Sequence, residues 1–283
     1  MRHVIAASLL LLLAGRVAPD ARSSTIFVDD FSGGRLDRSR WNAIVTGAGF
    51  ATVNDEQQAY VDAPETIGLL DGAEGAHGGV LAIRTRYTPG FKAPDGRTYD
   101  FTSGRLDTRS RFDFTYGTAA ARIRLTPGAG LWPAFWALGN GEWPDTGEID
   151  IMENVGDPTW VSFALHGPGY SADKGLVQRS RLAAPADIAG WHVYAVQWTK
   201  DALVFTIDDR PGWRVTRRTV ESHGRWAFDN AKHLIVNQAI GGAYPYAVNR
   251  ATTPYTGLPQ PAVDLIQAGR AVMLVDWVRV TQP

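Results

Sequence analysis

Short segments with the two-residue periodicity of β-strands recur along this chain, and they constrain its fold more than any other feature. They lie at 79–84, 118–125, 191–196 and 203–208. Successive side chains of a strand point to opposite faces, so this pattern is typical of sheets with one buried face. Glycine and proline are abundant but scattered, as turns between many short strands require. The residues 208–212 predict one such turn, and we expect a short helix over 261–268.

Length and composition favour one large β domain. With 283 residues the chain can bury a sizeable core, and all-β domains of this size are usually single units, so we expect residues 23–283 to form one domain. The formal net charge of −1 argues against nucleic acid as a partner. The chain has no cysteine, which excludes a disulfide framework and a lipid-bearing cysteine. We expect a monomer.

The amino-terminal segment has the pattern of a secretion signal. A basic start is followed by an apolar run over 4–14, and then by the small residues Ala18 and Ala21 as cleavage options. The apolar run is too short to anchor the protein in a bilayer. We therefore expect residues 1–22 to be a signal peptide, the cleaved protein to be free of the membrane, and its location to be secreted or periplasmic.

Three carboxylates lie among apolar residues in one strand-like segment. Glu148 and Asp150 are two residues apart, so on a strand they point to the same face. Glu153 is five residues after Glu148, an odd spacing that would put it on the opposite face. A single bulged residue, Ile151 or Met152, restores the parity and returns Glu153 to the face of the other two.

Two glutamates that flank an aspartate on one face are suited to cleaving a glycosidic bond. A retaining glycosidase needs a carboxylate nucleophile and a carboxylic acid roughly 5–5.5 Å apart. Carboxylates held close together cannot all ionise easily, so at least one pKa should rise and leave a protonated acid beside an ionised nucleophile. The alternatives are an acidic turn, or a cation site that includes Glu142 and Asp145. The apolar residues between the carboxylates favour a strand over an oxygen-rich metal loop.

The run from Glu148 to Glu153 resembles the signature of glycoside hydrolase family 16, in the bulged, laminarinase-like form of the endo-β-1,3-glucanase branch. Other segments resemble the family in its order along nearly the whole mature chain. They are 27–31, 41–42, 54–58, 103–105, 130–136, 166–171, 194–198, 237–242 and 276–280. The resemblance implies an all-β fold, a concanavalin-like β-jelly-roll sandwich of two curved antiparallel sheets, with a substrate cleft on the concave face.

The resemblance also implies a role for each carboxylate. Glu148 would be the nucleophile, and Glu153 would protonate the leaving oxygen and then activate water. Asp150 would orient Glu148, and His166 would lie on the neighbouring strand within reach of this cluster; a satisfied core or surface histidine is the alternative. No cofactor is required. A structural calcium ion, which some family members contain, is not indicated by this sequence.

Aromatic residues independently indicate a sugar cleft. The chain has ten tryptophans, and the apolar faces of pyranose rings pack on indole while the indole N–H bonds a polar partner. The three candidates for such contacts are Trp132, Trp136 and Trp143. Core packing is the alternative, above all for Trp136. The resemblance adds further residues that would contact sugar hydroxyls or serve as ordinary strand-end residues, namely Asn54, Glu56, Arg105 and Gln238.

The bulged signature favours β-1,3-glucan as the polysaccharide substrate. Galactans such as agar or carrageenan are the alternative, as is transglycosylation, but no obvious basic cluster is present to bind sulfate. The tyrosine-rich segment 243–259 is loop-like and could wall the cleft or be a surface meander. A non-catalytic glucan sensor would keep the cleft and lose the carboxylates, whereas Glu148 and Glu153 are both present here.

Overall fold

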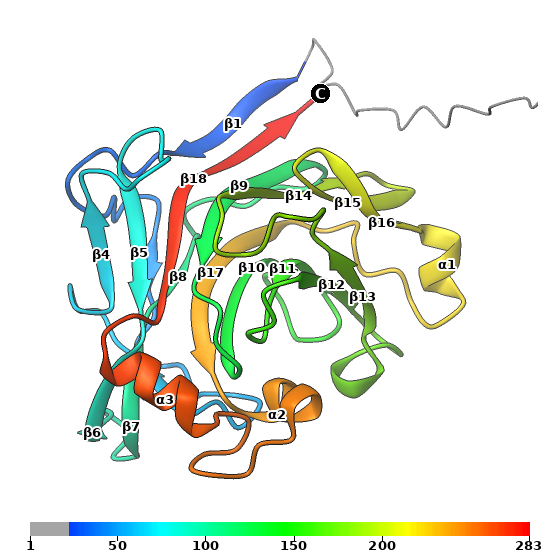
Figure 1. Cartoon of the computed structure of the whole chain (residues 1–283). Helices are drawn as coiled ribbons and strands as arrows, with labels where there is room; N and C mark the ends of the chain where they lie inside the picture. Colours follow the sequence, from blue (N-terminus) through cyan, green and yellow to red (C-terminus); the bar gives the residue numbers. More distant parts are fainter. Residues whose placement is uncertain (1–22) are drawn as a thin grey trace, which may run out of the picture.

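Two large antiparallel β-sheets pack face to face in the computed structural model, which describes residues 23–283 (Figure 1). The predicted signal peptide, residues 1–22, lies outside the described residues. The eight-stranded sheet contains β1 Ser24–Asp29, β4 Ile67–Leu70, β5 Val80–Arg84, β9 Gly117–Leu125, β14 His192–Trp198, β15 Ala202–Ile207, β16 Arg210–Thr216 and β18 Val272–Gln282. Its order is β16-β15-β14-β9-β18-β5-β4, and β1 also pairs with β18. The predicted all-β architecture of two antiparallel sheets is confirmed.

The seven-stranded sheet lies inside the curve of the larger one, so its free face is the concave side (Figure 1). Its strands are β2 Asn42–Ala43, β8 Arg105–Asp107, β10 Leu131–Gly139, β11 Glu148–Glu153, β12 Trp160–His166, β13 Leu176–Arg181 and β17 Lys232–Ile240. They follow the order β13-β12-β11-β10-β17-β8-β2, so β13 is an edge strand. A third, small sheet contains β3 Gln58–Tyr60, β6 Arg86–Lys92 and β7 Thr98–Ser103.

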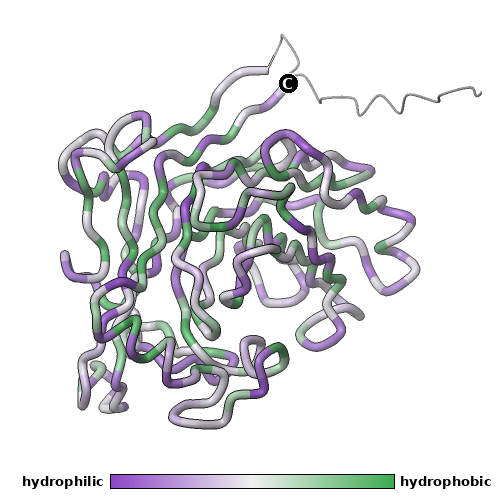
Figure 2. Tube along the Cα trace, viewed as in Figure 1, coloured by the Kyte–Doolittle hydropathy of each residue, from purple (hydrophilic) through white to green (hydrophobic). Residues whose placement is uncertain are grey.

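The core lies between the two large sheets, and alternate side chains of each strand point into it. Figure 2 shows hydrophobic and hydrophilic residues alternating along the chain. In β12, Val161, Phe163 and Leu165 are fully buried in this core. The ring of Phe163 stacks on Phe205 of the opposite sheet with centroids 5.1 Å apart. Residues between these positions in β12 therefore point to the concave face.

The turn predicted over 208–212 is shorter in the structure. Asp208 and Asp209 have φ angles of 50° and 61°, and β16 begins directly afterwards at Arg210. Two central residues with positive φ match the twist of a two-residue hairpin. Pro211 thus lies within a strand, which is tolerated because β16 is at the edge of its sheet.

The described helices are few and short: η1 Ala172–Lys174, α1 Arg217–Glu221, α2 Ala243–Asn249 and α3 Gln260–Gln267. The helix predicted over 261–268 is confirmed by α3. The loop-like reading of 243–259 is wrong at its start, where α2 forms. Pro245 falls in the first turn of α2, where a missing N–H removes no intrahelical bond. None of the described helices is long and apolar enough to cross a membrane.

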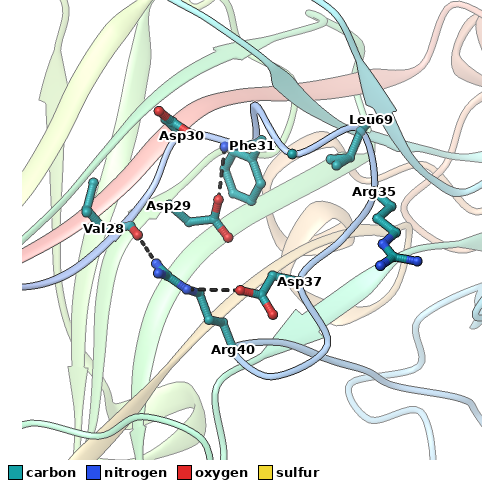
Figure 3. A pocket seen from close by; sticks show the side chains of 9 residues that line it. Val28, Asp29, Asp30, Phe31, Arg35, Asp37, Arg40 and Leu69 are labelled. Atoms are coloured by element: carbon teal, nitrogen blue, oxygen red, sulfur yellow. Dashed lines mark hydrogen bonds and ion pairs between the residues drawn. The ribbon is translucent and has the colours of Figure 1, made fainter.

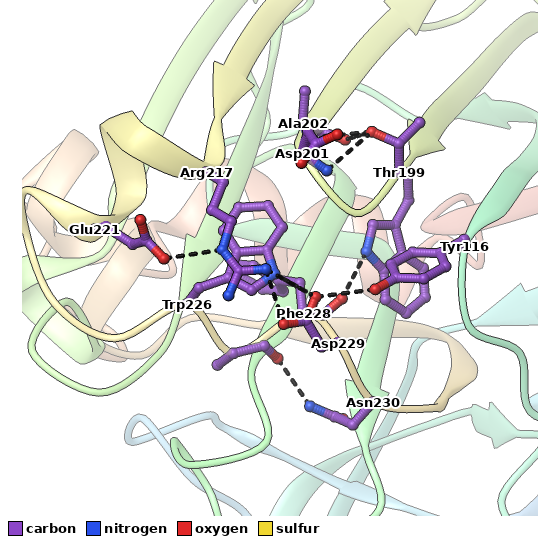
Figure 4. Close-up of polar contacts among 12 residues, drawn as sticks. Tyr116, Thr199, Asp201, Ala202, Arg217, Glu221, Trp226, Phe228, Asp229 and Asn230 are labelled. Carbon is purple, nitrogen blue, oxygen red and sulfur yellow. Dashed lines mark hydrogen bonds and ion pairs between the residues drawn. The ribbon is translucent and has the colours of Figure 1, made fainter.

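Asp229 fixes the loop before β17 to the eight-stranded sheet and to α1 (Figure 4). Its carboxylate accepts hydrogen bonds from the Tyr116 hydroxyl at 2.9 Å and the Trp226 indole N–H at 2.8 Å. It also pairs with the Arg217 guanidinium at 3.0 Å. The loop that follows Trp226 is therefore held in one place against the seven-stranded sheet.

That loop contacts Gly147, the residue directly before β11. Gly147 has φ +72°, and a Cβ built there would lie 2.5 Å from the carbonyl oxygen of Ala227. Only glycine combines this backbone conformation with such a close approach. The buried ammonium of Lys232 strengthens the same junction, since it donates to the carbonyls of Thr146 and Ala227. The start of β11 is thus fixed against the loop that contains Ala227.

Candidate active site

A β-bulge in β11 brings its carboxylates to one face. Along the β10–β11 ladder, Phe135 pairs with Met152 and Trp136 pairs with Asp150, so Ile151 is the extra residue. Ile151 and Met152 are both fully buried in the core. The bulge expected at one of these two residues is confirmed.

The concave face carries the three predicted carboxylates. Glu148 pairs with Leu138 of β10 and Glu153 pairs with Ala134, so four ladder steps, about 13 Å of backbone, separate the two glutamates. Asp150 lies between them on the same face and is buried. The glutamate side chains must lean toward each other over the concave surface if both are to act on one bond.

Each glutamate accepts a hydrogen bond from a different tryptophan. The Trp143 indole N–H donates to Glu148 Oε2 at 2.7 Å, and the Trp132 indole N–H donates to Glu153 Oε1 at 2.8 Å. Trp143 is 47% exposed, so much of its ring remains available to a ligand. Both tryptophans therefore lie beside the carboxylates and each orients one of them, while their contact with a sugar stays a prediction.

Burial and mutual repulsion shift the pKa values of this cluster. Burial raises the pKa of Glu153 to about 7, the Trp132 hydrogen bond lowers it, and the Glu148 charge raises it further. The pKa of Asp150 is well above its ordinary value because of its burial and then the charges of Glu148 and Glu153. Near neutral pH, Glu153 can therefore hold the proton that a general acid needs.

His166 lies on β12, as expected, directly across the ladder from Glu148. Its Nε2 is 3.5 Å from Asp150 Oδ2, and burial lowers its pKa, although the Glu148 charge raises it. One donor atom each from Glu148, Asp150 and His166 lie within 4.8 Å of one another, a spacing that could hold a divalent cation. Metal ligands must be deprotonated, and the raised pKa of Asp150 opposes this.

A second polar cluster lies beside the carboxylates, over β10, β17 and β8. Trp136 donates its indole N–H to Asn237 Oδ1 at 2.7 Å, and the Arg105 guanidinium lies 4.9 Å from the Trp136 ring centre. Asn237 donates to the Tyr60 hydroxyl at 3.1 Å, and that hydroxyl donates to Glu56 at 3.1 Å. The structure thus brings together the predicted Trp136, Arg105 and Glu56, and it adds the two residues that link them.

Gln238 does not face the cleft, which corrects its prediction as a substrate contact. Its buried side chain donates to Thr85 Oγ1 at 2.9 Å on the opposite face of β17. Neighbouring residues of a strand point to opposite faces, so Asn237 takes the concave side instead. Asn54 is exposed in a turn, where its carbonyl accepts from the Ala243 N–H at 2.8 Å. A sugar contact from its side chain stays a prediction.

Tyr244 of α2 was not predicted as a site residue, yet it borders the Glu153 end of the cluster. Its ring packs edge-on against Trp132 with centroids 5.6 Å apart. Its hydroxyl donates to Ser162 Oγ, which lies on the concave face of β12, at 3.0 Å. The tyrosine-rich segment therefore supplies a wall at this end. The richness in tyrosine was the only sequence signal for it.

A cavity of about 310 Å³ lies beside β1 and does not involve the carboxylates of β11 (Figure 3). Arg40 pairs with Asp37 at 3.1 Å and also donates to the Val28 carbonyl. The Asp29 carboxylate accepts from the Phe31 N–H at 2.9 Å. Because these polar groups bond one another, we assign the cavity no ligand.

Residues 76–255 match the family model for glycosyl hydrolases family 16. A β-glucanase from Rhodothermus marinus is 35% identical over 267 residues, which cover 90% of this chain and 84% of that protein. The X-ray structure of endo-β-1,3-glucanase from Pyrococcus furiosus has a TM-score of 0.76 at 32% identity, covering 92% of this chain and 94% of that one. SCLam, a non-specific endo-β-1,3(4)-glucanase from the same family, has a TM-score of 0.78 at 29% identity, covering 95% and 94%. The predicted jelly-roll fold is confirmed, and the chain belongs to glycosyl hydrolases family 16 and is a glycoside hydrolase.

Proposed function

We propose that the protein is an endo-acting β-1,3-glucanase that cleaves its polymer with retention of anomeric configuration. The observation that carries the proposal is the pair Glu148 and Glu153, which share one face of β11 and differ in surroundings. Each accepts a tryptophan N–H, and burial raises the pKa of Glu153 to about 7. The similarity to β-glucanases that act on β-1,3-linked glucans supports the choice of substrate.

In the first step, the Glu148 carboxylate attacks the anomeric carbon while the bond from that carbon to the leaving oxygen breaks. Glu153 gives its proton to the leaving oxygen, so one sugar chain departs with a free hydroxyl and the other is esterified to Glu148. In the second step, Glu153 takes a proton from water, whose oxygen attacks the anomeric carbon and releases Glu148. Two inversions restore the original configuration.

Asp150 supports both steps without contacting the reacting bond. Its carboxyl is buried beside Glu148, and this burial and the neighbouring charges raise its pKa, which favours the protonated form. A protonated Asp150 can donate a hydrogen bond to Glu148 and so orient the nucleophile. It also spares the site a further buried negative charge.

The test is product release from laminarin, lichenan, carboxymethyl cellulose, agarose and carrageenan by the wild type and by Glu148→Gln. We expect laminari-oligosaccharides with the β-anomer formed first by NMR, and a loss of turnover in Glu148→Gln with folding and oligosaccharide binding intact. Glu142→Gln, which alters an exposed carboxylate in the preceding loop, is the matched control. Residual activity of Glu148→Gln within tenfold of the wild type would refute the nucleophile assignment.

Further arms of the same assay separate the alternatives. Release from a galactan alone would keep the mechanism and overturn the substrate, and products longer than the added oligosaccharide would indicate transglycosylation. Family 16 glucanases are in general independent of cofactors, so a chelator should leave the rate unchanged. Loss of activity in chelator, restored by one divalent ion, would instead assign a metal to Glu148, Asp150 and His166.

We also propose that residues 1–22 direct export, because a polymeric substrate is met outside the cytoplasm. The support is the basic start and the apolar run that follows it. Fractionation of a bacterial host should find the full chain outside the cytoplasm and a variant without residues 2–22 inside it. Retention of both in the cytoplasm would refute this proposal.

A further inference from the structure

One row of side chains crosses the concave face from Glu153 to the edge of the sheet. Glu153 pairs with Ser162 of β12, and Ser162 pairs with Arg179 of β13. Neighbouring strands are about 4.8 Å apart, so Arg179 lies about 10 Å from Glu153 at the backbone. Val161, Phe163 and Leu165 of β12 point into the core, so Ser162 and the rest of this row face the cleft.

The guanidinium of Arg179 is held over an aromatic ring. It lies 4.4 Å from the ring centre of Trp160, a buried residue on the cleft face of β12. Such stacking orders a long side chain, and the guanidinium also donates a hydrogen bond to the Tyr244 hydroxyl, which leaves it further N–H groups for a ligand. Arg181, the next residue on this face, instead donates to Thr159 Oγ1 at 3.2 Å. Arg179, opposite Ser162, is thus the one of the two that lies in the row of Glu153.

No carboxylate of residues 23–283 lies within salt-bridge distance of Arg179. Its neighbours in the cleft are Ser162 and Tyr244, which bond each other. A neutral sugar needs only hydroxyl partners, whereas a guanidinium fork matches the two oxygens of a carboxylate or sulfate. The centre of the cleft holds the Glu148 carboxylate proposed as the nucleophile, which would repel the same anion.

We propose that the β13 edge of the cleft, formed by Arg179 on Trp160, binds an anionic substituent of the polysaccharide. The substituent is a carboxylate or sulfate on a sugar unit that lies over β13, a short distance along the chain from the cleaved bond. This rests on the proposed function, and it narrows the substrate class to a β-glucan that carries sparse negative charge.

Arg179 could otherwise only protect an edge strand, since charged residues there prevent pairing with other chains. For that role the charged side chain could lie on either face of β13. Arg279 provides the comparison, because it is also exposed and lies 5.0 Å from the ring centre of Trp277, but on β18 of the other sheet. The two arginines share their packing and differ in their relation to the cleft.

The test uses neutral laminarin, sparsely carboxylated laminarin and sparsely sulfated laminarin with the wild type, Arg179→Gln and Arg279→Gln. We expect Arg179→Gln to lower the ratio of kcat/KM for a charged polymer to kcat/KM for the neutral one by about tenfold, which is ~1.4 kcal/mol. Arg279→Gln should leave the ratio unchanged. Mass spectrometry should find the charged sugar at a fixed distance from the cleaved bond in wild-type products and at scattered distances in Arg179→Gln products. The carboxylated and sulfated arms identify which anion is preferred.

Binding separates this inference from the proposed function. In the Glu148→Gln background, calorimetry with charged and neutral laminari-oligosaccharides should show tighter binding of the charged ones, and this preference should disappear with Arg179→Gln. Equal binding of both, or an equal loss for both in Arg179→Gln, would overturn the inference. Tight binding of charged chains by a wild type that cleaves none of them would uphold the anion site and refute the enzymatic proposal.

Discussion

Replacing Trp132 with phenylalanine should shift the alkaline limit of activity upward. The change keeps most of the ring that packs on Tyr244 and removes the N–H that Glu153 accepts at 2.8 Å. That hydrogen bond favours the ionised carboxylate and lowers its pKa, which burial has raised to about 7. A bond to a charged group contributes ~1.5 kcal/mol at the low end, and one pH unit corresponds to ~1.4 kcal/mol.

A general acid must be protonated, so kcat/KM falls as pH rises through the pKa of Glu153. The assay is the pH profile of kcat/KM on laminarin between pH 4 and pH 10. In Trp132→Phe we expect the alkaline limb to move up by about one pH unit while the acid limb stays in place. Trp136→Phe is the matched control, because its indole N–H donates to Asn237 and not to a carboxylate. An alkaline limb that stays fixed or moves down in Trp132→Phe would refute this account of Glu153.

Two further predictions concern β11 and the residue directly before it. The pKa of Glu153 is raised above its ordinary 4.5 to about 7, so its contribution to stability is full below pH 4.5 and is lost as pH rises through 7. Glu153→Gln should therefore raise the free energy of unfolding in urea at pH 8, by on the order of 3 kcal/mol, and change it little at pH 4.5. Gly147→Ala, which forces a Cβ against the Ala227 carbonyl at positive φ, should cost about 1–3 kcal/mol in urea and lower kcat. An unchanged unfolding curve for Glu153→Gln at pH 8 would contradict the first prediction, and one for Gly147→Ala would contradict the second.

The shared face of the three carboxylates could be predicted because β11 has a period of two that only the odd spacing of Glu153 breaks. A single bulged residue is the smallest change that restores the period. Gln238 could not be placed, because every residue of β17 is buried and its sequence carries no alternation that separates the two faces. Asn237, one position away, was therefore equally eligible. Local pattern is informative only where one face meets water.

Tyr244 and Arg179 escaped prediction for different reasons. Tyr244 lies on a helix of seven residues, which is too short to show a helical period. Arg179 belongs to an edge strand that is mostly exposed, so its sequence shows no buried face. Its direction is set by its register with β12, which is a tertiary property. The sequence shows no obvious basic cluster, because a single guanidinium on the cleft face does not stand out when charges are counted along the chain.

Because β11 contains an extra residue, the number of residues between Glu148 and Glu153 does not set their spacing along the ladder with β10. Ile151 adds one residue to the strand but no rung to its ladder with β10, so Glu148 and Glu153 stay opposite Leu138 and Ala134. A relative with one residue fewer here could present both glutamates at the same rungs on a regular strand. A one-residue gap at this position in an alignment therefore marks a change in local twist and core filling, and two chains of unequal length can share one catalytic geometry.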